Sequence, residues 1–334
     1  MNRAALVVNR SEVKAAEIEA LYRTAAAACV DAGWPAPELL LADEADPGTG
    51  QAEQALRDSA DLVVACGGDG TVNAVAAVLA GTGAALGIVP LGAGGVLAAD
   101  LGLPDGLDEA VSTLITGVDR RIDLGRAGDR VVLGAAALGL AAALVADVPA
   151  RLRKRIGGPA YLWPIARHLG DRGMSVTFEL DGRTVRHRAV RTALIGNLGC
   201  ARAGLDLIPD AEPDDGLLDL VVLTPRGRVL GWFGVLAELI SSRGCNTHDV
   251  SRYRAGHIVA RTRRPVAQEV DGQFVGRGVC LDVEVQHLAL AVRVPRIRAA
   301  VADTGPPDPR WSADSGPAGR IGPQSAPAAG ADHG

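Results

Sequence analysis

Short apolar runs and amphipathic segments alternate through the first third of the chain. The apolar runs that have the length of buried strands lie at 4–8, 38–41, 61–66 and 85–89. The segments with apolar positions at helical spacing lie at 12–32, 49–59, 72–80 and 107–115. Strands and helices that alternate in this way predict a parallel sheet with helices on both faces. We therefore expect an α/β domain over residues 1–121.

The pattern changes near residue 122, where short segments alternate apolar and polar positions with a period of two. The segments typical of strands are 122–126, 130–137, 174–180, 183–196, 217–223, 257–262 and 279–285. Turns such as Asp181-Gly182 and Asp271-Gly272 lie between strand candidates and are hairpin signals. Helical spacing interrupts them only at 159–169 and 229–242. This pattern predicts an antiparallel β-sandwich domain over residues 122–285.

Composition narrows the class of protein. The 334-residue chain is 48% hydrophobic and carries a net charge of −5, which is ordinary for a globular protein and disfavours a nucleic-acid binder. Its five cysteines have no Cys-x-x-Cys spacing, which favours free thiols in a reducing compartment. No apolar stretch fits a membrane span or a signal peptide, so we expect a cytoplasmic protein. Residues 305–334 are rich in Pro, Gly, Ala and Ser, which predicts a disordered tail.

A glycine-rich segment, Gly67-Gly-Asp-Gly-Thr71, directly follows the strand at 61–66 and opens the helix at 72–80. A strand, a glycine-rich turn and a helix N-terminus together point backbone N–H groups at one place, as in phosphate sites. Asp69 is unusual there, because a carboxylate repels phosphate unless a cation lies between them. The segment therefore predicts Mg²⁺-linked nucleotide chemistry, and the alternative is a glycine-rich turn without a ligand.

Three further segments carry polar groups. Residues 90–95 again follow a strand and open a helix, so this second loop is expected to face the same crevice as the first. The run Asp214-Asp-Gly-Leu-Leu-Asp219 gathers carboxylates that suit Mg²⁺, although a capped, solvated turn is an equal alternative. The segment Gln268-Glu-Val-Asp-Gly-Gln273 by itself indicates only a hairpin turn.

Together these motifs resemble the diacylglycerol kinase catalytic-domain family, which includes bacterial lipid kinases and is similar to sphingosine kinases. The resemblance covers about residues 1–295 and rests on the order and spacing of the two glycine-rich loops, Gly196-Asn197, Ile208-Pro-Asp-Ala211 and the acidic run. It implies a nucleotide domain and a β-sandwich lipid-substrate domain, and it implies that 286–300 return to the first domain. NAD kinases share the first motif, but the acidic run is typical of the lipid kinases.

The resemblance implies ATP- and Mg²⁺-dependent phosphorylation of a lipid alcohol. It places Asp69 near the metal and the transferred phosphoryl group, and it implies that Asp215 and Asp219 bind or orient Mg²⁺. The positions that it implies for nucleotide binding are Gly67, Gly68, Gly70, Thr71, Asn73, Gly92 and Gly94. The catalytic position that takes the substrate proton is occupied here by Gln273. The lipid, the nucleotide preference and the oligomeric state are left open.

The chain departs from the family at polar positions of the expected site. The departures are Ala93, Gly95 and Ala99 for Thr, Asn and Arg of the second loop, Gly134 and Ala141 for an Asn and an Asp, and Gln273 for the Glu that takes the proton. The amide of Gln273 cannot accept a proton as a base at neutral pH. These departures favour an alternative function, a catalytically impaired member that binds nucleotide or lipid and regulates.

One basic cluster is a candidate for contact with a membrane surface. Residues 151–155, Arg-Leu-Arg-Lys-Arg, precede Tyr161 and Trp163. Basic residues beside aromatic ones suit the anionic inner face of a membrane, which fits a lipid substrate. A solvated charged loop is the alternative, and it is the commoner meaning of such a charge run.

Overall fold

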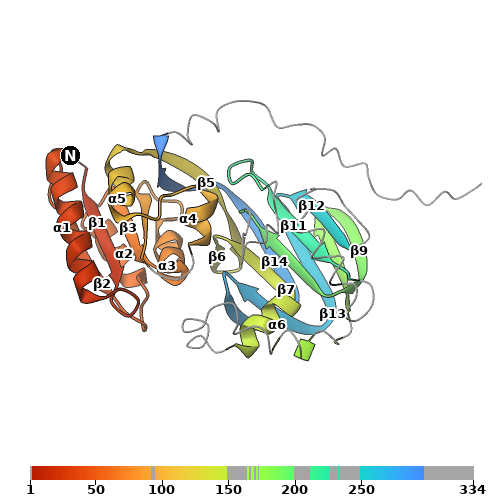
Figure 1. Ribbon diagram of the computed structural model, residues 1–334. Helices are drawn as coiled ribbons and strands as arrows, with labels where there is room; N and C mark the ends of the chain where they lie inside the picture. Colours follow the sequence, from red (N-terminus) through yellow and green to blue (C-terminus); the bar gives the residue numbers. More distant parts are fainter. Residues whose placement is uncertain are drawn as a thin grey trace, which may run out of the picture.

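The protein is described by a computed structural model in which an α/β domain and a β-sandwich domain lie side by side (Figure 1). The structure describes residues 2–91, 95–148, 164, 167–168, 171, 173–198, 211–225, 232 and 249–296. Several predicted features lie outside the described residues: the tail, the basic cluster 151–155 with Tyr161 and Trp163, most of the helical segments 159–169 and 229–242, and Gly92, Ala93 and Gly94 of the second loop.

The N-terminal domain is built on a parallel sheet with strand order β4-β3-β1-β2. Its strands are β1 (Ala4–Asn9), β2 (Glu38–Ala42), β3 (Leu62–Gly67) and β4 (Ala85–Pro90). Its helices are α1 (Ala15–Asp31), α2 (Thr49–Arg57), α3 (Asp69–Leu79), α4 (Val96–Asp100) and α5 (Leu107–Thr116). The expected parallel sheet is confirmed.

Helices cover both faces of this sheet, which explains why its strands are continuously apolar. Ala5 and Val7 of β1 pack in one core cluster with residues of α2, α3 and α4, whereas Leu6 and Val8 pack in another with residues of α1 and α5. Successive strand residues point to opposite faces of the sheet. When helices cover both faces, every position of the strand is buried, so apolar and polar residues do not alternate.

The C-terminal domain is an antiparallel β-sandwich, as expected. Its elements are β5 (Val118–Ala127), β6 (Arg130–Val132), β7 (Ala135–Gly139), α6 (Leu140–Asp147), β8 (Met174–Leu180), β9 (Arg183–Val190), β10 (Thr192–Gly196), β11 (Leu218–Leu223), β12 (Val250–Ala255), β13 (His257–Val270) and β14 (Gln273–Val294). Fully buried Phe178 and Ile195 belong to its core cluster.

Strand β14 belongs to both domains. Its first half pairs with β13 in the sandwich, and its second half pairs with β5 and then, at Ala291 and Val292, runs parallel to Ala85 and Leu86 of β4. The two domains therefore share one hydrogen-bonded ladder, visible as the long blue strand between them in Figure 1. Through this strand the sandwich is joined to the parallel sheet at the first residues of β4.

Several element boundaries differ from the sequence expectations. Helix α3 begins at Asp69, three residues before the expected start, so the glycine-rich motif forms the first turn of the helix rather than a loop before it. Helix α6 and strand β12 were not expected, because 140–147 has no polar face and 250–255 alternates weakly. Within the described ranges, no helix is long and apolar enough to cross a membrane.

Candidate active site

The corner between β3 and α3 is a tight backbone turn that only small residues permit. Gly67 ends β3, and Gly68 caps α3 with an extended backbone. A Cβ atom on Gly67 would lie 2.9 Å from Oγ1 of Thr71, so a larger residue does not fit there. Gly70 differs, because it is exposed and a Cβ atom on it would meet nothing within 4 Å. A glycine at 70 therefore adds no side chain over the start of the helix.

Thr71 and Asn73 occupy different environments in α3. Thr71 is fully buried, and its Oγ1 accepts a hydrogen bond of 3.2 Å from Nδ2 of Asn9 at the end of β1. This bond joins the first turn of α3 to the sheet. Asn73 is half-buried in the same helix. The side chain of Thr71, a predicted nucleotide-binding residue, therefore faces the protein interior and joins the start of α3 to β1.

Asp69 links the two glycine-rich loops. Its Oδ1 accepts a hydrogen bond of 2.7 Å from the backbone N–H of Gly95, the residue that caps α4. Gly95 has a φ of +85°, in the left-handed region that glycine and asparagine tolerate best. Ala99 is exposed on α4. The structure therefore brings Asp69 and the described end of the second loop together at one edge of the sheet.

A carboxylate that sequence reasoning did not single out also lies at this corner. The N–H of Gly68 donates a hydrogen bond of 2.8 Å to Oε2 of Glu12, which follows β1. A negative side chain at a helix N-terminus is stabilised by the helix dipole. It also adds negative charge where a phosphate would bind. The signal was the position of Glu12 just past the carboxyl end of a parallel strand, at the edge where ligands bind.

The two aspartates predicted as Mg²⁺ ligands are held by an arginine. Arg254 of β12 lies directly opposite Asp219 of β11, with 3.2 Å between Nε and Oδ1, and its Nη2 lies 2.9 Å from Oδ2 of Asp215. Burial raises the pKa of Asp215, and the Arg254 guanidinium partly opposes that shift. In the part of the chain that is described, no group of three or more His, Cys, Asp or Glu side chains is placed to hold a metal ion. Asp215 and Asp219 are therefore paired with a guanidinium in this structure, and their role as Mg²⁺ ligands stays a prediction.

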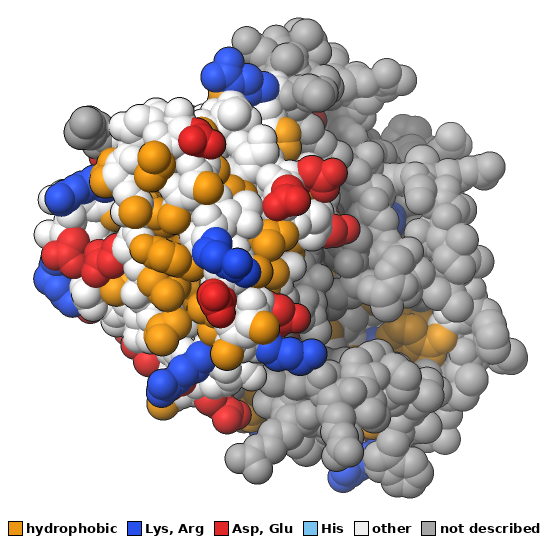
Figure 2. All heavy atoms as spheres, turned by 60° about the vertical axis from the view of Figure 1, so that its left-hand side comes forward, with side chains coloured by type: hydrophobic (Ala, Val, Ile, Leu, Met, Phe, Trp, Pro, Cys, Tyr) orange, Lys and Arg blue, Asp and Glu red, His pale blue; other side chains and the backbone are white. Residues whose placement is uncertain are grey.

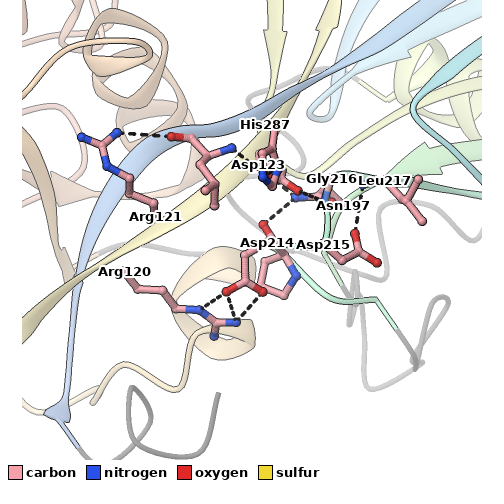
Figure 3. Close-up of polar contacts among 11 residues, drawn as sticks. Arg120, Arg121, Asp123, Asn197, Asp214, Asp215, Gly216, Leu217 and His287 are labelled. Carbon is pink, nitrogen blue, oxygen red and sulfur yellow. Dashed lines mark hydrogen bonds and ion pairs between the residues drawn. The ribbon is translucent and has the colours of Figure 1, made fainter. Parts of the chain in front are cut away.

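A fully buried carboxylate, Asp123 of β5, organises the joint between the domains (Figure 3). Its Oδ1 accepts hydrogen bonds from Nδ1 of His287 at 2.8 Å and from the N–H of Leu288 at 2.6 Å. Its Oδ2 accepts a bond of 2.6 Å from the N–H of Gly216. These bonds hold the acidic run against an irregular segment of β14, where Leu288 has a positive φ.

Two neighbours complete this joint (Figure 3). Nδ2 of buried Asn197 donates to the backbone oxygens of Asp123 at 2.9 Å and Pro213 at 3.1 Å. Arg120 forms a bidentate ion pair with Asp214, with 2.9–3.0 Å between the nitrogen and oxygen atoms. The acidic run is thus part of a structural joint, in which Arg120 pairs with Asp214 and Arg254 is shared by Asp215 and Asp219. Its role in the fold was not evident from the sequence, because Asp123 and Arg120 are far away along the chain.

The turn between β13 and β14 carries no available carboxylate. Both oxygens of Asp271 accept backbone N–H bonds, from Leu133 at 2.9 Å and from Gly134 and Ala135 at 2.8 and 3.0 Å. Glu269 is buried and accepts a bond of 2.7 Å from the N–H of Gly272. Gln273 is exposed at the first position of β14.

Comparison with known proteins supports this arrangement. The diacylglycerol kinase catalytic domain matches residues 3–127, and the YegS C-terminal NAD kinase beta sandwich-like domain matches residues 134–294. A protein of Pseudomonas syringae pv. syringae (strain B728a) named "Probable lipid kinase YegS-like" is 34% identical over 209 residues, which cover 62% of this chain and 68% of that protein. The chain belongs to the diacylglycerol kinase catalytic-domain family.

Two other relatives define how far the likeness reaches. A protein of the same name from Klebsiella pneumoniae (strain 342) is 32% identical over 190 residues, which span 56% of this chain and 64% of that protein. A crystal structure of a diacylglycerol kinase from Bacillus anthracis str. Sterne has a TM-score of 0.68 at 18% identity and covers 88% of this chain and 97% of that one. The structural likeness supports the fold of this lipid kinase family.

The structure places three of the positions at which this chain departs from the family pattern, Gly95, Gly134 and Ala141. Gly95 preserves a left-handed backbone that the family's Asn also tolerates, so the exchange removes an amide and keeps the turn. A Cβ atom on Gly134 would lie 3.3 Å from Oδ1 of Asp271, so glycine relieves crowding there. Ala141 is in the first turn of α6 and leaves that turn without a carboxylate. The scaffold of the family is therefore kept while its polar side chains are reduced.

Replacing Arg254 by Met is expected to lower the free energy of unfolding by about 2–3 kcal/mol, because Asp215 and Asp219 are left without their cation. Added MgCl₂ should then raise the thermal midpoint of this variant more than that of the unmodified protein, since Mg²⁺ binds the folded pair of carboxylates. Thermal unfolding without nucleotide measures both effects. The control Arg57→Met, which removes an exposed ion pair with Glu53, should change stability by less than about 0.5 kcal/mol. An equal rise of the thermal midpoint with Mg²⁺ in Arg254→Met and in the unmodified protein would contradict the role of Arg254 as the cation that pairs with Asp215 and Asp219.

Proposed function

We propose that this protein transfers the γ-phosphate of ATP, taken up as its magnesium complex, to the hydroxyl of a lipid alcohol. The observation that carries the proposal is the start of α3, where exposed Gly70 places no side chain over the helix N-terminus beside Asp69. Backbone N–H groups and the helix dipole at such a corner favour phosphate. The bond from Gly95 to Asp69 supports a role for both glycine-rich loops in one nucleotide site.

The residues of this chain would act mainly by positioning and by charge. Phosphoryl transfer passes through a loose transition state, so most of the catalysis comes from alignment and charge neutralisation. Backbone N–H groups of the first turn of α3 would bind phosphate oxygens, and Asp69 would hold the magnesium, which neutralises phosphate charge when bound. Thr71 and Asn9 hold the corner rigid from behind.

A second candidate function has its own observation. Gln273 stands where the family has a proton-accepting Glu, and neither Asp271 nor buried Glu269 is available to replace it, since both accept backbone hydrogen bonds. A member that binds nucleotide or lipid and transfers phosphate slowly, or only binds and regulates, is consistent with this arrangement. Turnover separates the two functions.

Asp69→Asn is expected to weaken Mg·ATP binding by about 10–100-fold while changing the thermal midpoint little. The amide oxygen still accepts the bond from Gly95, and only the charge that faces magnesium is lost. Calorimetric titration with ATP and MgCl₂ measures the affinity. Asp105→Asn, in an exposed loop, is the matched control. A large loss of stability with unchanged nucleotide binding would show that the carboxylate is structural.

Glu12→Gln is expected to tighten ATP binding by about tenfold. The amide oxygen still accepts the N–H of Gly68, whereas the negative charge beside the phosphates is removed. The same titration measures this change. Glu17→Gln, in the first turn of α1, is the control on the same segment. Unchanged or weaker ATP binding in Glu12→Gln would contradict repulsion between this carboxylate and the phosphates.

A further inference from the structure

The hairpin of β13 and β14 exposes apolar and basic side chains together. We name Arg263, Arg264, Phe274, Arg277 and Val279 the Arg-Phe hairpin. Phe274 is 44% exposed and Val279 is 48% exposed. Among the described residues, the other large apolar side chains with comparable exposure are on α1 and β2 of the other domain. Exposed apolar residues gathered on one segment mark an interaction surface more often than isolated ones do.

The arginines of this hairpin have no acidic partner within the described ranges. The ion pairs there include Arg261, whose Nε lies 3.4 Å from Oε1 of Glu179, but none with Arg263, Arg264 or Arg277. By contrast, the face of the N-terminal domain in Figure 2 mixes basic and acidic side chains among apolar ones. The Arg-Phe hairpin is therefore a positive surface whose charge is available to an external anion.

Strand register places the apolar and basic groups together. Phe274 lies opposite Glu269, and Arg277 lies opposite Ala267, two residues away on the same side of β13. Val279 follows Arg277 by two residues and so points to the same side. Arg263 and Arg264 lie in the register shift that faces this part of β14.

The same register disfavours another strand as the occupant. Pairing of β14 with β5 begins only at Glu284, so residues 273–283 form an edge beside β13. Two register shifts interrupt this part of the hairpin, one between Arg261 and Val266 and one between Gln268 and Glu269. Bulges and charges of this kind prevent a neighbouring chain from adding a strand.

We propose that the Arg-Phe hairpin docks this protein on an anionic lipid bilayer. The arginines bind lipid phosphates, and Phe274 and Val279 enter the interfacial region, which accommodates aromatic and aliphatic side chains. The proposal rests on the lipid substrate of the proposed function. It also orients the site relative to the membrane, because Gln273, at the position of the family's catalytic Glu, directly precedes Phe274. Docking through this hairpin would hold the acceptor position at the membrane surface.

The test is co-sedimentation of the full chain with vesicles of phosphatidylcholine and with vesicles that also contain phosphatidylglycerol. The unmodified protein should bind the anionic vesicles and lose that binding at high salt. The combined variant Arg263→Gln/Arg264→Gln/Arg277→Gln should bind them about 100-fold more weakly, since each arginine near an anionic surface contributes about fivefold. Phe274→Ser/Val279→Ser should also bind more weakly.

Matched controls lie on the other domain. Val30→Ser/Leu41→Ser and Arg23→Gln/Arg57→Gln remove exposed apolar and basic groups there and should leave vesicle binding unchanged. Binding that does not distinguish the two vesicles, or that neither hairpin variant reduces, overturns the docking surface. Because vesicle binding requires no turnover, hairpin-dependent binding without kinase activity supports docking and counts against the proposed function. Turnover of detergent-dispersed lipid without vesicle binding supports the proposed function and overturns the docking surface.

Discussion

Gln273→Glu is expected to raise the rate of phosphate transfer from ATP to a lipid alcohol by about 10²–10⁴-fold, the usual contribution of a general base. The position is exposed at the start of β14, so a carboxylate fits there without desolvation. Neither Asp271 nor Glu269 of the same turn is placed to supply that base, because Asp271 accepts three backbone N–H bonds and Glu269 is buried against Gly272. Single-turnover kinetics with saturating ATP measure the change.

Further variants separate a missing base from a weakened nucleotide site. Gln273→Met keeps the size of the side chain and should not raise the rate. The loop reversion Ala93→Thr/Gly95→Asn/Ala99→Arg restores the family's side chains, and it should improve ATP affinity more than the chemical step. If only the combination of both reversions is active, nucleotide binding is the main defect. If the unmodified protein is already as fast as Gln273→Glu, the amide is not a defect.

Asp123→Ala is expected to destabilise the protein by about 3–5 kcal/mol. Its carboxylate is fully buried and accepts hydrogen bonds from Gly216, His287 and Leu288, and two of these donors are backbone N–H groups. A buried donor left without an acceptor costs about 1–3 kcal/mol, so losing several exceeds a typical single mutation. Denaturant unfolding measures the loss.

The control for this variant comes from the same part of the chain. Asp129 is exposed in the turn between β5 and β6, and Asp129→Ala should change stability by less than about 0.5 kcal/mol. Asp123→Asn should fall between the two, because one amide oxygen still accepts while the NH₂ group faces a donor. A loss of only about 1 kcal/mol in Asp123→Ala would show that the joint is held by other contacts, such as the ion pair of Arg120 with Asp214.

Local patterns in the sequence were sufficient to predict most of the fold. The strands of the first sheet are apolar because helices cover both faces, and the change to a period of two marks the sandwich. The resemblance added the family, which the comparisons confirm. The start of α3 was misplaced, because Asp69-Gly-Thr is typical of a turn until the helix N-terminus is seen to need its small residues.

Contacts between distant residues account for what could not be predicted. Arg254 meets Asp219 only through the pairing of β12 with β11, and β12 itself lacks a strong alternating pattern. Asp123 contacts Leu288 because β5 and β14, which are far apart along the chain, pair side by side there, and Gly216 lies against the same carboxylate. No spacing along the chain encodes such a meeting. The aspartates of the acidic run therefore resembled metal ligands, whereas the structure pairs Asp215 and Asp219 with an arginine.

Lipid kinase activity is tested most directly by transfer of labelled γ-phosphate from ATP to a panel of lipid alcohols by the unmodified protein with MgCl₂. A lipid kinase gives a labelled phosphorylated lipid, formed in equal amount with ADP and lost in Asp69→Asn. Tight ATP binding with no labelled lipid, in both the unmodified protein and Gln273→Glu, would contradict the kinase and favour a nucleotide-binding regulator.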